Sequence, residues 1–356
     1  MTGRPDAPPT DLSPPARVDH AAAAVAAWMR HRFLLLLLAV YAVAVAVPWP
    51  GMWLREREFL TDGMPLTRVL LTVLLFNAGL AVSAKGLSES FGRPQVLVFA
   101  VFLRFLIAGA VALFAAATLP AAMGGVVIGL TLMAVVPAAG SSPAWTHASG
   151  GLVSTSLGIV AVSTLCGPIA GSLLFGLVGP FLAGDHQEVS TQLVARLASA
   201  QVVGWILLPP VAGAALRSLL GEERVRGGKP WISLINLVLL LVLIYAFAAA
   251  SMRQVLVDGR YGLLATAAVA AALMAGVNFA AGATLGWRRG RDRGERVALL
   301  YGIGMQNNGV AMLIGGMALA ADSPAFLPMI AHALVQHLAA GTAATLLERR
   351  GGDGNE

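Results

Sequence analysis

The stretch MAVVPAAGSSPAWTHASGG, Met133–Gly151, interrupts an apolar segment with residues that break helices or prefer water. An apolar run leads into it, and another, LVSTSLGIVAVSTL, follows it directly. Because Pro and Gly disrupt helices, some backbone amides and carbonyls here lose their helical partners. Such a break persists at membrane depth only where protein or a water-filled cavity satisfies those groups. The stretch therefore predicts a broken membrane-spanning helix beside a cavity or a binding site.

The composition is that of a membrane protein. The 356 residues are 57% hydrophobic and only 12% charged, and the mean hydropathy is +0.77. Soluble domains carry about 25% charged residues, whereas apolar runs of about 20 residues suit bilayer-spanning helices. We therefore expect an all-α polytopic protein that resides in the lipid bilayer. The basic residues flank these runs, so the pI of 10.2 does not indicate nucleic-acid binding.

Ten spans are predicted, in two sets of five. Their approximate ranges are 32–48, 65–83, 94–119, 121–147, 151–176, 190–217, 231–251, 261–287, 294–320 and 325–347. With both termini in the cytoplasm, most of the 24 Lys and Arg residues lie on the cytoplasmic side, as the positive-inside rule requires. The sequence thus predicts a multi-pass protein of a bacterial-type inner (plasma) membrane.

The domain boundaries follow from the same pattern. Residues 1–29 are rich in Pro, Asp and Ala, and they predict a disordered cytoplasmic tail. The membrane-spanning unit is placed at 30–347, with internal repeats at about 32–176 and 190–347. Residues 348–356 are expected to form a short cytoplasmic tail. The single cysteine, Cys166, excludes an intramolecular disulfide and a cysteine-based metal cage.

A second break, YGIGMQNNGV (Tyr301–Val310), interrupts the ninth span. Each break thus lies in the fourth span of its half, and five spans per half give the halves opposite orientations. Paired breaks in inverted halves point to a secondary-transporter binding site. Ser142 before Pro143 is expected to cap one restarted helix, and Asn307 or Asn308 the other. Helix starts favour anions, although kinked helices of a channel or enzyme remain an alternative.

Several stretches resemble the bile acid:sodium symporter family, in order and in the expected spans. They are LFNAGLAVSAKGL, FGRPQVLVFAVFLRFLI, VVPAAGSSPAWT, STSLGIVAVSTLCGPI, GIGMQNNGVA and VQHLAAGTAA. The most specific element is Gly304–Asn307, and the resemblance covers about 32–347. It implies ten helices in two inverted repeats, with helices 3, 4, 5, 8, 9 and 10 forming a core domain. Helices 1, 2, 6 and 7 would form a panel domain, and broken helices 4 and 9 would cross in the core.

The resemblance also implies a function. Members bind an organic anion between core and panel, with two sodium ions usually in the core, and we expect alternating access for small organic anions. The candidate substrate contacts are the half-helix starts and one histidine: Gly140, Ser141, Ser142, Asn307, Asn308 and His337. The candidate ion-site region comprises Arg104, Ser142, Ser156, Gly302, Ile303, Met305 and Gln306.

The sodium ligands depart from the family pattern. Pro143 stands where the family has Asn, Val160 where it has Thr, and Gly302 where it has Glu, whereas Ser156 is retained. A hard cation prefers about six oxygens, with a negative one among them in a dry site. Two hypotheses therefore stay open: transport without sodium, or a sodium-coupled symporter that uses mainly backbone ligands. We assign no firm metal site and expect no cofactor.

Arg104 falls in mid-span, where the family commonly has Gln. A charge in this place is costly and usually meets a partner or a cavity. It could snorkel, attract substrate anions directly, or act as a built-in cation that bonds the carbonyls and Gln306 in place of sodium. The sequence leaves these three interpretations of Arg104 open.

The remaining polar residues give weaker signals. Asn77 is expected to join helices or line a cavity, and His147 to be interfacial or to contact substrate or handle protons. His337 matches a family histidine, yet Leu338 replaces the Asn beside it. His332, Gln336 and Asn278 are predicted to be packing groups. No catalytic motif is present, so we predict a non-enzyme; a membrane sensor or enzyme on the same scaffold is the rival.

Overall fold

The computed structural model describes residues 14–59, 64–197, 199–286 and 291–352. In these ranges the chain is almost entirely helical. Its named strands are one short antiparallel pair, β1 (Glu58–Phe59) and β2 (Met64–Pro65). The all-α class predicted from composition is therefore confirmed.

Five helices in the described residues are long and apolar enough to cross a membrane. They are α6 (Pro94–Thr118), α9 (Val153–Val178), α12 (Glu222–Val257), α13 (Tyr261–Gly286) and α16 (Phe326–Gly352). Two bent pairs raise the number to as many as seven: α1 (Pro14–His31) with α2 (Phe33–Ala46), and α4 (Leu66–Leu80) with α5 (Ala84–Ser90). The chain is thus a multi-pass membrane protein.

Both predicted breaks are present. The fourth predicted span consists of η1 (Ala121–Met123), α7 (Gly124–Val135) and α8 (Ser142–Ala148). The ninth consists of α14 (Arg293–Gly304) and α15 (Asn308–Ala318). Helix α7 ends where it does because Val136 precedes Pro137, whose ring pushes the preceding residue to the extended backbone that Val136 adopts.

Three boundaries differ from the sequence prediction. The predicted sixth span, 190–217, is divided between α10 (Asp185–Leu197) and α11 (Ala200–Leu220). Helix α10 is amphipathic, with one buried face formed by Ser190, Leu193 and Leu197, so it does not continue the apolar helix. The unpredicted helix α3 (Trp49–Glu56) follows Pro48, and η2 (Gly179–Phe181) extends α9.

The predicted disorder of residues 1–29 is wrong for residues 14–29, which belong to α1. An alanine-rich run favours helix, and Ala22 and Ala26 are buried. Asp19 accepts a hydrogen bond from Trp231 of α12 (2.9 Å), and Arg30 donates to Ser233 (2.6 Å). The C-terminal tail is likewise helical to Gly352, the end of α16. Residues 1–13 and 353–356 lie outside the described residues.

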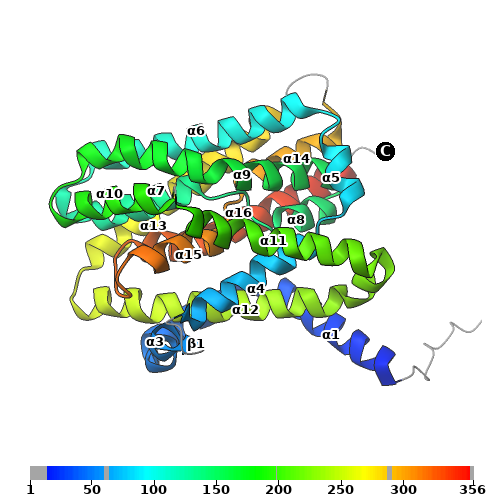
Figure 1. Ribbon diagram of the computed structural model, residues 1–356, viewed down its shortest axis with the longest axis horizontal. Coiled ribbons are helices and arrows are strands. Elements are labelled where there is room, and N and C mark those ends of the chain that lie inside the picture. Colours follow the sequence, from blue (N-terminus) through cyan, green and yellow to red (C-terminus); the bar gives the residue numbers. More distant parts are fainter. Residues whose placement is uncertain (1–13, 60–63, 198, 287–290, 353–356) are drawn as a thin grey trace, which may run out of the picture.

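The helices pack in two layers (Figure 1). By their contacts, α2, α3, α4, α11 and α12 form one layer, which we name the panel layer, and α6, α7, α8, α9, α13, α14, α15 and α16 form the other, which we name the core layer. Helices α6 and α12 run along opposite edges of the molecule in Figure 1. In the panel layer α4 and α11 approach closely through glycine: a Cβ on Gly79 would lie 1.9 Å from the Pro210 oxygen. Small residues commonly permit such contacts between membrane helices.

Candidate functional site

The two breaks meet and pair with each other. The Ala139 amide donates to the Met305 oxygen (3.1 Å), and the Asn307 amide donates to the Pro137 oxygen (2.9 Å). Ala138 and Gln306 form an isolated antiparallel bridge. These bonds give partners to backbone groups that the broken helices leave free. The sequence prediction that the breaks cross each other and are non-helical for a few residues is confirmed.

The fourth-span break is held from α9. The Ala138 amide donates to Ser163 Oγ (3.0 Å), and Ser142 Oγ lies 3.2 Å from Ser156 Oγ. The predicted cap is wrong in detail, because Ser141 is the N-cap residue of α8 and makes no side-chain cap bond. Ser142 is instead fully buried with its hydroxyl turned to Ser156. The seven-residue α8 is therefore positioned by α9 rather than by a capping side chain.

The ninth-span break is fixed by one cap and one long-range bond. Asn307 Oδ1 accepts from the Val310 amide (3.2 Å), so the predicted cap of α15 is confirmed for Asn307. The Gln306 amide donates to Gln336 Oε1 on α16 (3.0 Å). Gln336 thus helps to fix the ninth-span break. The sequence predicted only a packing role for Gln336, and this one was missed.

Arg104 lies between the two breaks. Its Nη2 donates to the Val136 oxygen (2.5 Å) and its Nη1 to the Met305 oxygen (3.3 Å). Its side chain does not snorkel, since Arg104 is only 1% exposed. No ion pair involves it in the residues that the structure covers. The guanidinium is therefore a buried positive charge that two backbone carbonyls, one from each break, help to solvate.

The space beside Gly302 is filled by a hydrocarbon side chain. A Cβ at Gly302 would lie 2.7 Å from Ile159 Cδ1 of α9. Ile303 and Met305 are fully buried next to it. The Gln306 side chain is also buried, yet neither its nitrogen nor its oxygen has a partner. Arg104 therefore bonds the break through backbone carbonyls, and the expected bond to the Gln306 side chain is not formed.

The predicted substrate residues are only partly brought together. Gly140 and Ser141 are exposed, Asn307 is half-buried, and Asn308 is buried with an unpartnered side-chain amide. The panel helix α4 faces them: Ala78 is 3.4 Å from a Cβ built on Gly140, and Leu71 is as close to one on Gly309. These exposed and half-buried groups form a surface at the boundary of core and panel.

The histidines and Asn77 have other surroundings. His337 packs its ring against Phe33 of α2 (4.7 Å) and bonds the Ala333 oxygen through Nδ1 (2.6 Å). His147 is exposed on α8, whereas His332 is fully buried with both ring nitrogens unpartnered. Asn77 donates to Asn236 of α12 (2.8 Å) and so joins two panel helices. This bond supports helix packing, one of the two roles expected for Asn77.

Two comparisons with known proteins bear on identity. The model of the sodium bile acid symporter family matches residues 68–256, more than half of the chain. The matched segment runs from α4 to α12 and includes the break between α7 and α8. No curated protein matches the chain. The chain belongs to the sodium bile acid symporter family, a family of membrane transporters.

Proposed function

We propose that this protein is a secondary transporter of small organic anions that works by alternating access and does not need sodium. In this proposal the core layer moves against the panel layer, and the chain forms ten spans in two inverted five-helix repeats. The order of the helices supports it, because each half has its broken helix in the fourth place. Both termini would face the cytoplasm of a bacterial-type inner membrane.

The observation that carries the proposal is the position of Arg104. The Val136 and Met305 carbonyls, which could have faced a cation, accept hydrogen bonds from its guanidinium. At an effective dielectric constant of ~20, two positive charges ~4 Å apart repel by about 4 kcal/mol. That repulsion corresponds to roughly a thousandfold loss of affinity for a bound cation.

The surroundings of Arg104 support the same conclusion. The space that adjoins Gly302 is occupied by Ile159 and not by a carboxylate. The hydroxyl of Ser142 lies 3.2 Å from that of Ser156, so these two candidate ligands bond each other. We infer that the guanidinium does the structural work of a bound cation by neutralising the carbonyl dipoles of both breaks.

The anion would bind where the breaks reach the panel layer. Asn308 begins the eleven-residue helix α15, whose N-terminal end carries partial positive charge. Its buried side-chain amide has no partner in the described residues and could bond a carboxylate. Gly140, Ser141 and Asn307 complete the proposed surface, and Arg104 lies behind it as a permanent positive charge.

The deciding experiment is uptake into proteoliposomes. A panel of labelled carboxylates would be supplied in sodium, potassium or choline buffers at fixed pH and ionic strength. We expect saturable uptake of at least one carboxylate at rates that agree within twofold among the three cations. Steep, saturable dependence on sodium would refute the sodium independence, and absence of uptake for every carboxylate would refute the transport function.

One observation favours a second candidate, a sodium-coupled symporter with mainly backbone ligands. The Gln306 side-chain oxygen is buried and unpartnered, so one expected sodium ligand remains free. The same uptake assay separates the two candidates, because this alternative requires sodium to raise uptake steeply and saturably.

A further inference from the structure

The panel and core layers are joined by side-chain hydrogen bonds near one end of the molecule. Three such bonds cross between the layers in the described ranges, and all reach the loop after α15 or the first turns of α16. Arg55 Nη1 donates to the Ala321 oxygen (2.5 Å), and Ser251 Oγ donates to the same oxygen (3.3 Å). Tyr41 Oη donates to the Ile330 oxygen (2.7 Å). These contacts hold α2, α3 and α12 of the panel against the core.

Arg55 makes the most extensive of these contacts. Its guanidinium carbon lies 4.4 Å from the ring centre of Phe247 on α12 and 4.6 Å from that of Phe326 on α16. The two rings are 4.9 Å apart and both are buried. A cation over aromatic rings is attracted by their negative faces, more strongly where water is excluded. The Arg55 side chain of the panel layer thus contacts both the Ala321 carbonyl and the Phe326 ring of the core layer.

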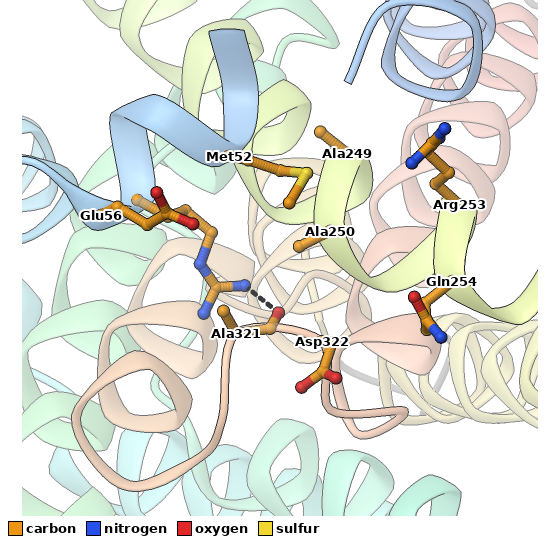
Figure 2. A pocket seen from close by; sticks show the side chains of 9 residues that line it. Met52, Glu56, Ala249, Ala250, Arg253, Gln254, Ala321 and Asp322 are labelled. Atoms are coloured by element: carbon orange, nitrogen blue, oxygen red, sulfur yellow. Dashed lines mark hydrogen bonds between the residues drawn. The ribbon is translucent and has the colours of Figure 1, made fainter. Parts of the chain in front are cut away.

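The charge of Arg55 persists at neutral pH. Burial lowers its pKa to about 10, and the nearby Asp322 carboxylate opposes that effect. A cavity of about 240 Å³ adjoins the guanidinium, and its rim includes Glu56 and Asp322 (Figure 2). If the guanidinium leaves the Ala321 oxygen, the Glu56 and Asp322 carboxylates of this rim are nearby partners for it.

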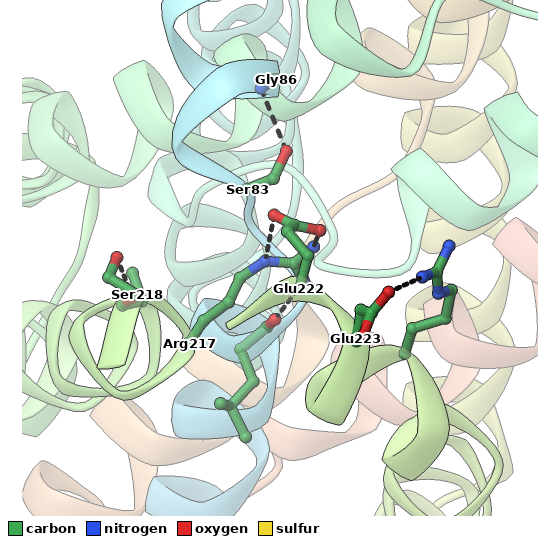
Figure 3. Close-up of polar contacts among 9 residues, drawn as sticks. Ser83, Gly86, Arg217, Ser218, Glu222 and Glu223 are labelled. Atoms are coloured by element: carbon green, nitrogen blue, oxygen red, sulfur yellow. Dashed lines mark hydrogen bonds and ion pairs between the residues drawn. The ribbon is translucent and has the colours of Figure 1, made fainter. Parts of the chain in front are cut away.

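The opposite end of the layers is tied differently. There Arg217 of α11 pairs with Glu222 (2.5 Å) and donates to the Leu80 oxygen (2.8 Å), both within the panel layer (Figure 3). Arg93 pairs with Glu295 (2.6 Å) within the core layer. In the described residues, neither ion pair crosses between the layers, so they strengthen each layer without holding the two together.

We propose that Arg55 is a latch that closes one end of the transport route by holding the panel layer to the core layer. The inference rests on the proposed function, in which the layers move against each other. The structure then represents the state closed at the Arg55 end, in agreement with the exposure of Gly140 and Ser141 at the crossing. Opening requires the guanidinium to leave the Ala321 oxygen and the Phe326 ring together.

The first test measures the distance between the layers without any substrate. Spin labels would be attached at Trp49→Cys and Phe181→Cys, both exposed, in a Cys166→Ser background. We expect Arg55→Leu to add a population of longer distances by double electron–electron resonance. The matched control is Arg253→Leu, since Arg253 lines the same cavity and makes no hydrogen bond between the layers within the described residues. A folded Arg55→Leu variant with the wild-type distance distribution would overturn the latch.

The second test measures access to the crossing. A reporter at Ala78→Cys, opposite Gly140, would be labelled with a membrane-impermeant maleimide from either side of oriented vesicles. Loss of a hydrogen bond from a charged donor should raise the rate from the Arg55 side roughly tenfold or more. Arg55→Lys keeps the charge but not the planar group and should give an intermediate rate. Equal rates for wild type and Arg55→Leu would contradict the proposal.

The two readouts separate this inference from the proposed function. If no carboxylate is transported but Arg55→Leu still lengthens the distances, the transport function fails, while the role of Arg55 in holding the two layers together stands. If wild type transports an anion and neither distance nor labelling responds to Arg55→Leu, the latch fails and the transport function stands.

Discussion

Sodium binding should be created by reversing the charge pattern at the crossing. The variant combines Arg104→Gln with Gly302→Glu, which removes a guanidinium and adds a carboxylate. Because a Cβ at Gly302 would lie 2.7 Å from Ile159 Cδ1, Ile159→Val is added to remove that methyl group. The next closest atoms of Ile159 are then 3.4 Å away, an ordinary contact.

The size of the effect follows from the contacts of Arg104. Its removal frees the Val136 carbonyl and one acceptor position of the Met305 carbonyl, which keeps its bond from the Ala139 amide. It also abolishes a repulsion of about 4 kcal/mol, roughly three orders of magnitude in affinity. A ligand at 100 times its dissociation constant stabilises the folded state by about 2.7 kcal/mol. Such binding should therefore raise the unfolding temperature by several degrees.

The assay is thermal unfolding of purified protein in sodium, potassium or choline chloride at equal ionic strength. We expect a saturable, sodium-specific rise for the triple variant and none for wild type or for the control Arg253→Gln. A sodium-specific rise in wild type would refute the idea that Arg104 replaces the ion. A folded triple variant without sodium binding would show that the remaining carbonyls cannot form the site.

Three further outcomes are expected. Asn307→Ala should lower stability by only about 0.5–2 kcal/mol, the range for a helix cap, yet reduce uptake far more; wild-type uptake at equal expression would contradict its substrate role. Gly79→Leu should abolish the monodisperse peak in size-exclusion chromatography, because its Cβ would overlap the Pro210 oxygen, whereas Gly276→Ala, which has open space, should not. Arg104 moves with the core layer, so the protein without substrate carries a positive charge across the membrane when the layers move. A bound monovalent anion neutralises that charge. One charge across 100 mV is worth about 2.3 kcal/mol. Anion exchange should therefore respond less to an imposed potential than net efflux does, and equal responses would contradict this.

The positions of the breaks could be predicted from the sequence because local chemistry decides them. Val136 precedes a proline, and Asn307 can cap a helix wherever one restarts after it. The resemblance to the family also placed the two breaks in equivalent spans. By contrast, the division of span 190–217 was missed: α10 is too polar to continue the apolar α11, and it is held in place by burying one face.

The predicted tail failed for a related reason. Composition alone indicated too few apolar residues for a core, but Ala22 and Ala26 need only small pockets on a neighbouring helix. The bonds from Trp231 to Asp19 and from Arg30 to Ser233 join segments about 200 positions apart. Such docking is a tertiary effect that propensity does not report.

The role of Arg104 depends on tertiary contacts that the sequence does not reveal. A mid-span arginine can bond a buried partner, face a cavity or reach the membrane surface. The residues next to Arg104 in the sequence do not distinguish these alternatives. The choice depends on two oxygens that lie 32 and 201 positions away along the chain and meet only because the breaks pair. A buried guanidinium has five donors to satisfy, and carbonyls that helices no longer use are acceptors that such a site can offer. The same broken backbone that makes a cation site possible can therefore accommodate a cation that belongs to the protein.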